Sequence, residues 1–250
     1  MSGHSKWSKV KHYKGTIDAR RGQIFAKLGK EISVACKHGG GDPGFNPRLR
    51  TILMKARAAN MPVDNIERAI KKGTGELPGV SYEEMTYEGY APGGVPLIID
   101  LLTDNKNRTA AEIRAIFSKH NGHMAGAGAV KHLFHRKGQI IIPREQIGED
   151  ELMTLVLDAG AEDLTADDSS YTITTDPHQF ETVHTLVEGR GLKPAAAEVA
   201  HLPVTPVPVT EEKTARGVLG LVEALEEHDD VQAVHAGFEI ADEIMEKMGG

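Results

Sequence analysis

Apolar residues recur at helical spacing in three segments of the first 75 residues. This spacing predicts helices over residues 18–36, 47–60 and 63–72, because positions three or four apart share one helix face. The predicted buried faces are Ile24, Phe25, Leu28, Ile32 and Ala35 in the first helix, Leu49, Ile52, Leu53 and Ala56 in the second, and Ile66, Ala69 and Ile70 in the third.

The predicted helix ends carry residues that favour those positions. The glycines at residues 39–41 close the first helix, because glycine accepts the left-handed conformation of many helix ends. Asn46 is a favoured N-cap, and Pro47 suits the first helical position. Gly73 and Gly75 are expected to stop the third helix. Residues 1–78 are therefore predicted to form one small helical domain.

After residue 81 the pattern changes to short alternating segments, which predict strands. Residues 82–90 and 95–102 are expected to form a hairpin across a turn of Pro and Gly. Thr109 and Glu112 have the spacing of a capping box, which predicts that the next helix begins there. A further strand is predicted over residues 130–134.

Residues 139–209 predict strand, helix, strand, strand, helix and strand, the order of the ferredoxin-like split βαβ fold. The helix and strand predicted over residues 210–227 and 231–236 have no partners of their own, so we expect them to complete the sheet that begins at residue 82. The predicted fold class is α+β, with a helical domain, an α/β domain and a ferredoxin-like domain inserted into the second. The expected domains are residues 1–78, residues 79–136 with 210–250, and residues 137–209.

Charge is distributed unevenly along the chain. Residues 1–72 contain 16 Lys and Arg against 5 Asp and Glu, a net of +11. Residues 73–250 contain 13 against 31, a net of −18, so the overall charge of −7 conceals a cationic end. This division points to a polyanionic partner, most commonly nucleic acid, and predicts that contact is confined to the N-terminal part.

The rest of the composition limits the class of protein and its expected cellular location. An apolar content of 40% supports folded cores. Cys36 is the single cysteine, which excludes an internal disulfide and a paired-cysteine zinc site. The N-terminus lacks the apolar core of a secretory signal, and the longest apolar runs are too short to span a bilayer. We therefore expect a cytoplasmic protein without membrane contact.

Lysines alternate with aromatic residues in the first 15 residues, which have no apolar periodicity and are expected to form a flexible basic arm. Lysines neutralise phosphates, and aromatic rings stack on unpaired bases, worth about 1–3 kcal/mol per base. The alternative is a solvated tail with Trp7 folded back on the helices. The predicted nucleic-acid-binding residues are Lys6, Trp7, Lys9, Lys11, His12, Lys14, Arg20, Arg21, Lys27, Arg48, Arg50, Arg57, Arg68, Lys71 and Lys72.

The arginines of the helical unit have two interpretations. They either cover apolar surface with their methylene stems or contact phosphates, and we favour phosphate contact because acids are few in this unit. No helix presents an evident set of base-reading side chains, and Gln23 is the only Gln in the unit. Recognition of the backbone or of RNA shape is therefore favoured over the reading of a specific operator.

No catalytic or metal-binding constellation accompanies these features. The histidines at 120, 123, 132 and 135 form two H-x-x-H pairs. The first pair straddles a predicted helix end, and the second lies on a predicted strand, where residues three apart face opposite sides. Cys36 lies beside Lys37, which favours the thiolate, but no partner residues for catalysis accompany it. We predict no metal, no cofactor and no enzymatic activity, against the alternative of a hydrolase or metalloenzyme.

Several ordered motifs resemble the YebC/PmpR family, which is related to the mitochondrial translational activator of cytochrome c oxidase. They are GHSKW at 3–7, NPRLR at 46–50, NMP at 60–62, IERAIKKG at 66–73, YEGYAPGG at 87–94 and TDNKNRT at 103–109. The resemblance covers essentially the whole chain and implies three domains, with the third inserted into the second. It implies a DNA-binding transcriptional regulator or, as an alternative, a ribosome-associated translation factor that binds ribosomal RNA and relieves stalling at proline runs. A monomer and a weak dimer both stay open.

Overall fold

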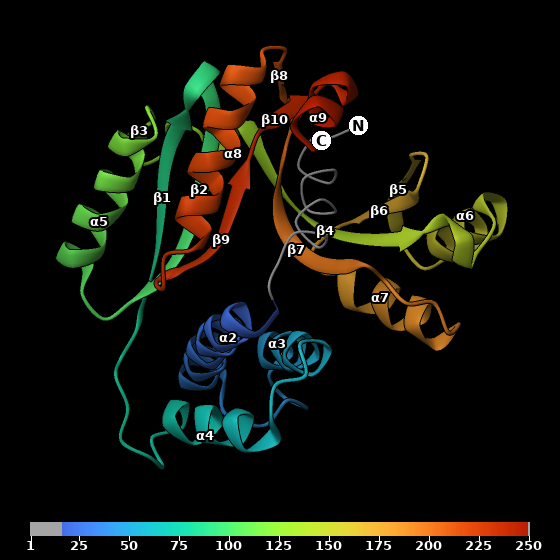
Figure 1. Ribbon diagram of the computed structural model, residues 1–250. Coiled ribbons are helices and arrows are strands. Elements are labelled where there is room, and N and C mark those ends of the chain that lie inside the picture. The colour runs from blue at the N-terminus through green and yellow to red at the C-terminus, as the bar shows by residue number, and fades with distance from the viewer. Residues whose placement is uncertain (1–16, 250) are drawn as a thin grey trace.

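The computed structural model describes residues 17–249 (Figure 1). The predicted basic arm, with Lys6, Trp7, Lys9, Lys11, His12 and Lys14, lies outside the described residues. Arg20 belongs to the first described helix, but its side chain is outside the described part of the chain.

Three helices form the N-terminal unit, as the apolar spacing predicts. They are α2 (Ile17–Gly39), α3 (Pro47–Ala58) and α4 (Val63–Gly73). Their shared core contains Ile32 and Leu49, both fully buried, together with Ala69. Ile24 is a correction, because its side chain is 47% exposed. The buried residues of α2 begin at Leu28, so the N-terminal part of the helix extends beyond this core.

The predicted start of α3 and the predicted end of α4 are both confirmed. The Asn46 side chain accepts a hydrogen bond from the Leu49 backbone N–H, with Pro47 at the first helical positions. Gly73 is the last residue of α4, and a Cβ atom there would come 2.4 Å from the backbone oxygen of Ser33 on α2. Gly73 therefore permits close packing of two helices.

The next unit is a four-stranded sheet in the order β3-β1-β2-β9, with every neighbouring pair antiparallel. The late strand β9 pairs with β2, which confirms that the chain returns to this sheet. Leu97 and Leu101 of β2 pack in one core with Phe117 of α5 and Leu221 of α8, so both helices cover the same face (Figure 1). The bounds are β1 Glu83–Ala91, β2 Val95–Thr103, β3 His123–Ala125, α5 Lys106–Lys119, α8 Glu212–Glu226 and β9 Val231–Ala236.

Two predictions in this unit are wrong. Helix α5 is capped by Asn105, four residues before the predicted start, and Thr109 is buried inside the helix, where its hydroxyl contacts other side chains. The predicted strand at 130–134 is a short 3-10 turn, η2 (Lys131–Leu133), followed by β4. The buried Glu88 carboxylate accepts backbone N–H bonds from residues 128, 130 and 131, and these bonds hold the segment in a turn.

The inserted unit has the ferredoxin-like order that the sequence predicts. Its antiparallel sheet runs β5-β6-β4-β7, and helices α6 and α7 contribute Leu152 and Val183 to one buried core with Ile140 of β4. The bounds are β4 Phe134–Pro143, α6 Glu149–Asp158, β5 Ala161–Ala166, β6 Ser170–Thr175, α7 Phe180–Gly189 and β7 Ala196–Pro203. The predicted domain boundaries stay a prediction.

The remaining elements are short. β8 (Val207–Val209) and β10 (Phe238–Ile240) form a separate parallel pair, and both strands contribute buried side chains to the core of the first sheet. The further segments are η1 Pro92–Gly94, η3 Arg144–Gln146 and α9 Asp242–Gly249.

Candidate nucleic-acid interface

Five of the predicted phosphate-binding cations are exposed and form no ion pair with another described residue. One lies on α2, one lies at the end of α3, and three lie on α4. They are Arg21, Arg57, Arg68, Lys71 and Lys72. Within α4, the spacing of Arg68, Lys71 and Lys72 places these charges within one turn of the helix.

Arg48 and Arg50 are already paired with acids of the other units. Arg48 donates to the Glu84 carboxylate at the start of β1. Arg50 lies 2.5 Å from the carboxylate of Glu181 on α7. All four side chains are more than one-third exposed, so each pair is worth about 0–1 kcal/mol and can exchange cheaply for a phosphate.

Helix α2 is fastened to the loop after α8 by three side chains. Gln23 donates to the Glu227 carbonyl at 2.5 Å, and Lys27 donates to the Glu226 carbonyl at 2.6 Å. Lys30 donates to the Asp229 carbonyl at 2.9 Å. These carbonyls lie at or just beyond the C-terminal end of α8, where a cation is favoured by the helix dipole. Lys27 therefore makes a structural contact, and the phosphate role predicted for it stays a prediction.

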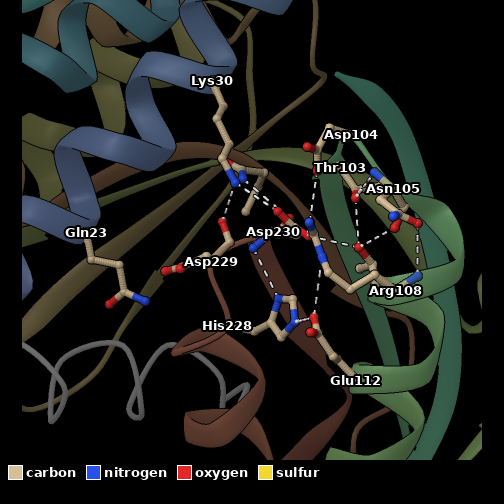
Figure 2. A network of polar contacts seen from close by, with 12 residues as sticks. Gln23, Lys30, Thr103, Asp104, Asn105, Arg108, Glu112, His228, Asp229 and Asp230 are labelled. Atoms are coloured by element: carbon tan, nitrogen blue, oxygen red, sulfur yellow. Dashed lines mark hydrogen bonds and ion pairs between the residues drawn. The ribbon is translucent and has the colours of Figure 1, made fainter. Parts of the chain in front are cut away.

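Asp230 is the centre of this contact (Figure 2). Its carboxylate lies 2.9 Å from the Lys30 ammonium and 2.7 Å from the Arg108 guanidinium, and it accepts the Thr109 hydroxyl at 2.8 Å. Burial opposes ionisation, but these hydrogen bonds outweigh it and hold the pKa of Asp230 well below its usual range. The network joins α2, α5 and the residue that precedes β9 at one point.

The same place contains a potential metal-binding group of described residues. Ligand atoms of Glu112, His228 and Asp230 lie within 4.8 Å of one another. The Asp230 oxygens already hold two cationic side chains, and His228 Nδ1 accepts the backbone N–H of Asp230. Those bonds would have to break before an ion could bind, so the arrangement is better suited to joining helices than to holding a metal.

The most prominent histidine–carboxylate pair fastens strands together. His235 of β9 lies with Nε2 3.1 Å from the Asp100 carboxylate of β2, and its Nδ1 accepts the backbone N–H of His201 on β7. Burial raises the pKa of Asp100, but contact with the two histidines more than compensates and lowers it. Both ring nitrogens of His235 are thus occupied, which leaves neither open to a substrate.

Burial also raises the pKa of the Cys36 thiol, which disfavours a reactive thiolate.

A cavity of about 810 Å³ lies between α2, α4 and the linker that leads to β1. Phe25 and Tyr82 contribute aromatic rings to its lining, and α4 contributes Asn65, Arg68 and Lys72. The sequence predicts Arg68 and Lys72 as phosphate-binding residues, but it assigns no binding role to Phe25, Asn65 or Tyr82. The spacing of Asn65, Arg68 and Lys72 along α4 was the available signal, since residues three and four apart share a face.

Among the described helices, none is long and apolar enough to cross a membrane.

Comparison with known proteins gives matches over most of the chain. Residues 5–76 match the TACO1/YebC protein N-terminal domain, and residues 82–238 match the TACO1/YebC second and third domain. A relative from Treponema pallidum is 54% identical over 98% of this chain and its own full length, and one from Persephonella marina is 49% identical over 99% of this chain and its own full length. Both are named probable transcriptional regulatory protein.

A solved structure has the same fold. The crystal structure of a conserved hypothetical protein from Aquifex aeolicus is 46% identical, with a TM-score of 0.83, and the match covers 93% of this chain and 96% of that one.

Proposed function

Because the chain belongs to the TACO1/YebC family, we propose that it is a non-enzymatic, cytoplasmic regulator of gene expression that binds nucleic acid through α2, α3 and α4. The observation that carries this proposal is the group of exposed cations on α3 and α4 that no described acid neutralises. The remainder of the chain is acidic and would be repelled by phosphates, so the helical unit is the part that binds.

The first candidate is a DNA-binding transcriptional regulator. Both relatives above are named probable transcriptional regulatory protein, and exposed Arg57, Arg68, Lys71 and Lys72 are suited to the phosphates of a duplex. The predicted arm at residues 1–15 would add further phosphate contacts. Such contacts fix orientation and affinity without reading sequence.

The second candidate is a translation factor that binds ribosomal RNA. The cavity beside α4 favours it, because aromatic rings within a concave site can stack on unpaired bases, which RNA loops offer and duplex DNA does not.

The two candidates differ in where the protein resides in a lysate. Sucrose-gradient sedimentation would be compared with promoter binding in the presence of scrambled DNA competitor. A preference for the promoter that survives competitor, with no ribosome association, supports transcriptional regulation. Co-sedimentation with ribosomes, with equal affinity for scrambled DNA, supports translation. Absence of both interactions would contradict the proposed function.

A further inference from the structure

We propose that the cavity between α2, α4 and the linker at residues 78–82 receives a single unstacked nucleobase, with the adjoining phosphates on Arg68 and Lys72. This inference rests on the proposed function and adds the form of nucleic acid that the helical unit prefers, namely a single strand or an unpaired loop. Three features of the cavity support the inference: its size and lining, the charge around it, and two glycines in its wall.

The cavity has a suitable size and lining. Its volume of about 810 Å³ falls within the roughly 300–1,000 Å³ of sites for small organic groups. Phe25, Met61 and Tyr82 supply apolar and aromatic surface, which suits the flat face of a base. Asn65 adds a side-chain amide, which can donate to and accept from a base edge.

The charge around the cavity suits phosphates. Arg68 and Lys72 lie on exposed positions of α4 and pair with no described acid, although each also lines the cavity. A base that enters the cavity brings its own phosphates to the same place. The site therefore provides stacking and charge together, which is the combination found where proteins hold single strands.

The wall formed by α2 contains two glycines for which packing gives no reason. Gly22 and Gly29 both line the cavity, and a Cβ atom at either would meet no described neighbour within 4 Å. Glycine weakens a helix interior, and its usual justification is close approach of another chain or of a ligand. Gly73 has such a reason in its contact with Ser33, whereas the two glycines of α2 keep the cavity open.

Tyr82 is held beside the cavity by the contact described above. The Lys30 ammonium lies 5.5 Å from the centroid of the Tyr82 ring, and the same ammonium is bonded to Asp230. The contact between Lys30 of α2 and Asp230, just before β9, thus positions one aromatic ring of the cavity lining before any ligand binds. Such pre-arrangement lowers the entropic cost of binding.

Filling the cavity tests this inference. Gly29→Leu places a branched side chain where the base would lie. The control Ala115→Leu adds a larger side chain at an exposed position of α5, outside the cavity lining. The probes are fluorescein-labelled 12-nucleotide single strands of RNA and of DNA, with the corresponding duplexes. Gly29→Leu is expected to weaken single-strand binding by roughly 5- to 100-fold, the loss of one stacked base, and to leave duplex binding unchanged. Ala115→Leu is expected to change neither.

The outcomes separate the base site from the general function. Equal affinity of wild type and Gly29→Leu for single strands would overturn the inference, as would an equal loss for duplexes. A loss for RNA alone identifies RNA as the source of the base, and a loss for both strands identifies unpaired nucleic acid generally. If the wild type binds none of the four probes, the proposed function itself fails. Gly29→Ala, expected to raise the thermal midpoint and still weaken single-strand binding, serves if the leucine variant does not fold.

Discussion

At the scale of single residues, specific hydrogen-bond donors keep two buried carboxylates ionised. Asp230 receives Lys30, Arg108 and Thr109, while Glu88 receives three backbone N–H groups. In both residues burial opposes the charge, and the hydrogen bonds more than compensate, so both pKa values lie below the usual range. These two side chains therefore stabilise the fold only while they remain ionised.

Asp230→Asn is expected to lower the free energy of unfolding by about 3 kcal/mol at pH 7, because the partly buried Lys30 and the buried Thr109 hydroxyl lose their charged acceptor. The contribution of Asp230 is present above the unfolded pKa of about 4 and declines as pH falls toward the lowered folded pKa. Urea unfolding at pH 7 and pH 3 measures this difference, which should shrink at the lower pH.

Asp104→Asn is the matched control, because Asp104 also binds Arg108 but is 39% exposed. It should cost no more than about 1 kcal/mol. A constant difference between wild type and Asp230→Asn across pH would show that the aspartate acts through its shape alone.

The sequence identified the charged residues but not their partners. Arg48 and Arg50 are paired with Glu84 and Glu181, which lie 36 and 131 positions further along the chain. Composition shows only that acids are scarce nearby in the sequence. The partners come from distant elements that only the whole fold brings together.

At the scale of elements, helices and strands followed their periodicity, and the errors arose where tertiary contacts decide. Thr109 has the sequence of a cap, but its hydroxyl reaches Asp230 from inside α5, and Asn105 serves as cap. The segment at 130–134 is apolar enough for a strand, but Glu88 draws its backbone N–H groups into a turn. Neither partner is local, so no local pattern reveals it.

Replacing either of two glycines of the helical unit by alanine is expected to change stability in opposite directions. Gly73→Ala places a methyl group 2.4 Å from the Ser33 backbone oxygen and 2.6 Å from the Cys36 Cβ atom, and is expected to cost about 1–3 kcal/mol. Gly29→Ala meets no described neighbour and is expected to gain about 0.5–1 kcal/mol. Thermal unfolding midpoints compare them. A Gly73→Ala midpoint at or above that of wild type would contradict the close packing of α4 on α2.

At the scale of the whole molecule, the two acidic units bind some of the cations of the basic helical unit. Lys27 and Lys30 hold the end of α8, and Arg48 and Arg50 pair with β1 and α7. Arg21, Arg57 and the cations of α4 are left exposed without a described ion pair. The charge division was visible in the sequence. The division of labour among the cations was not, because it depends on how the three units lie together (Figure 1).

The salt dependence of binding tests most directly whether the helical unit is the part that grips nucleic acid. Dissociation constants for a single-stranded oligonucleotide would be measured between about 50 and 200 mM salt for wild type and two fourfold alanine variants. One variant replaces Arg57, Arg68, Lys71 and Lys72. The matched control replaces Arg114, Lys119, Lys193 and Lys213, exposed cations of the acidic units that form no ion pair with a described residue. The first variant is expected to reduce the slope of log K against log salt by up to about 3, because each phosphate contact with a single strand contributes about 0.7, and the control is expected to leave the slope unchanged. Unchanged slope in the first variant, or an equal reduction in both, would contradict the account.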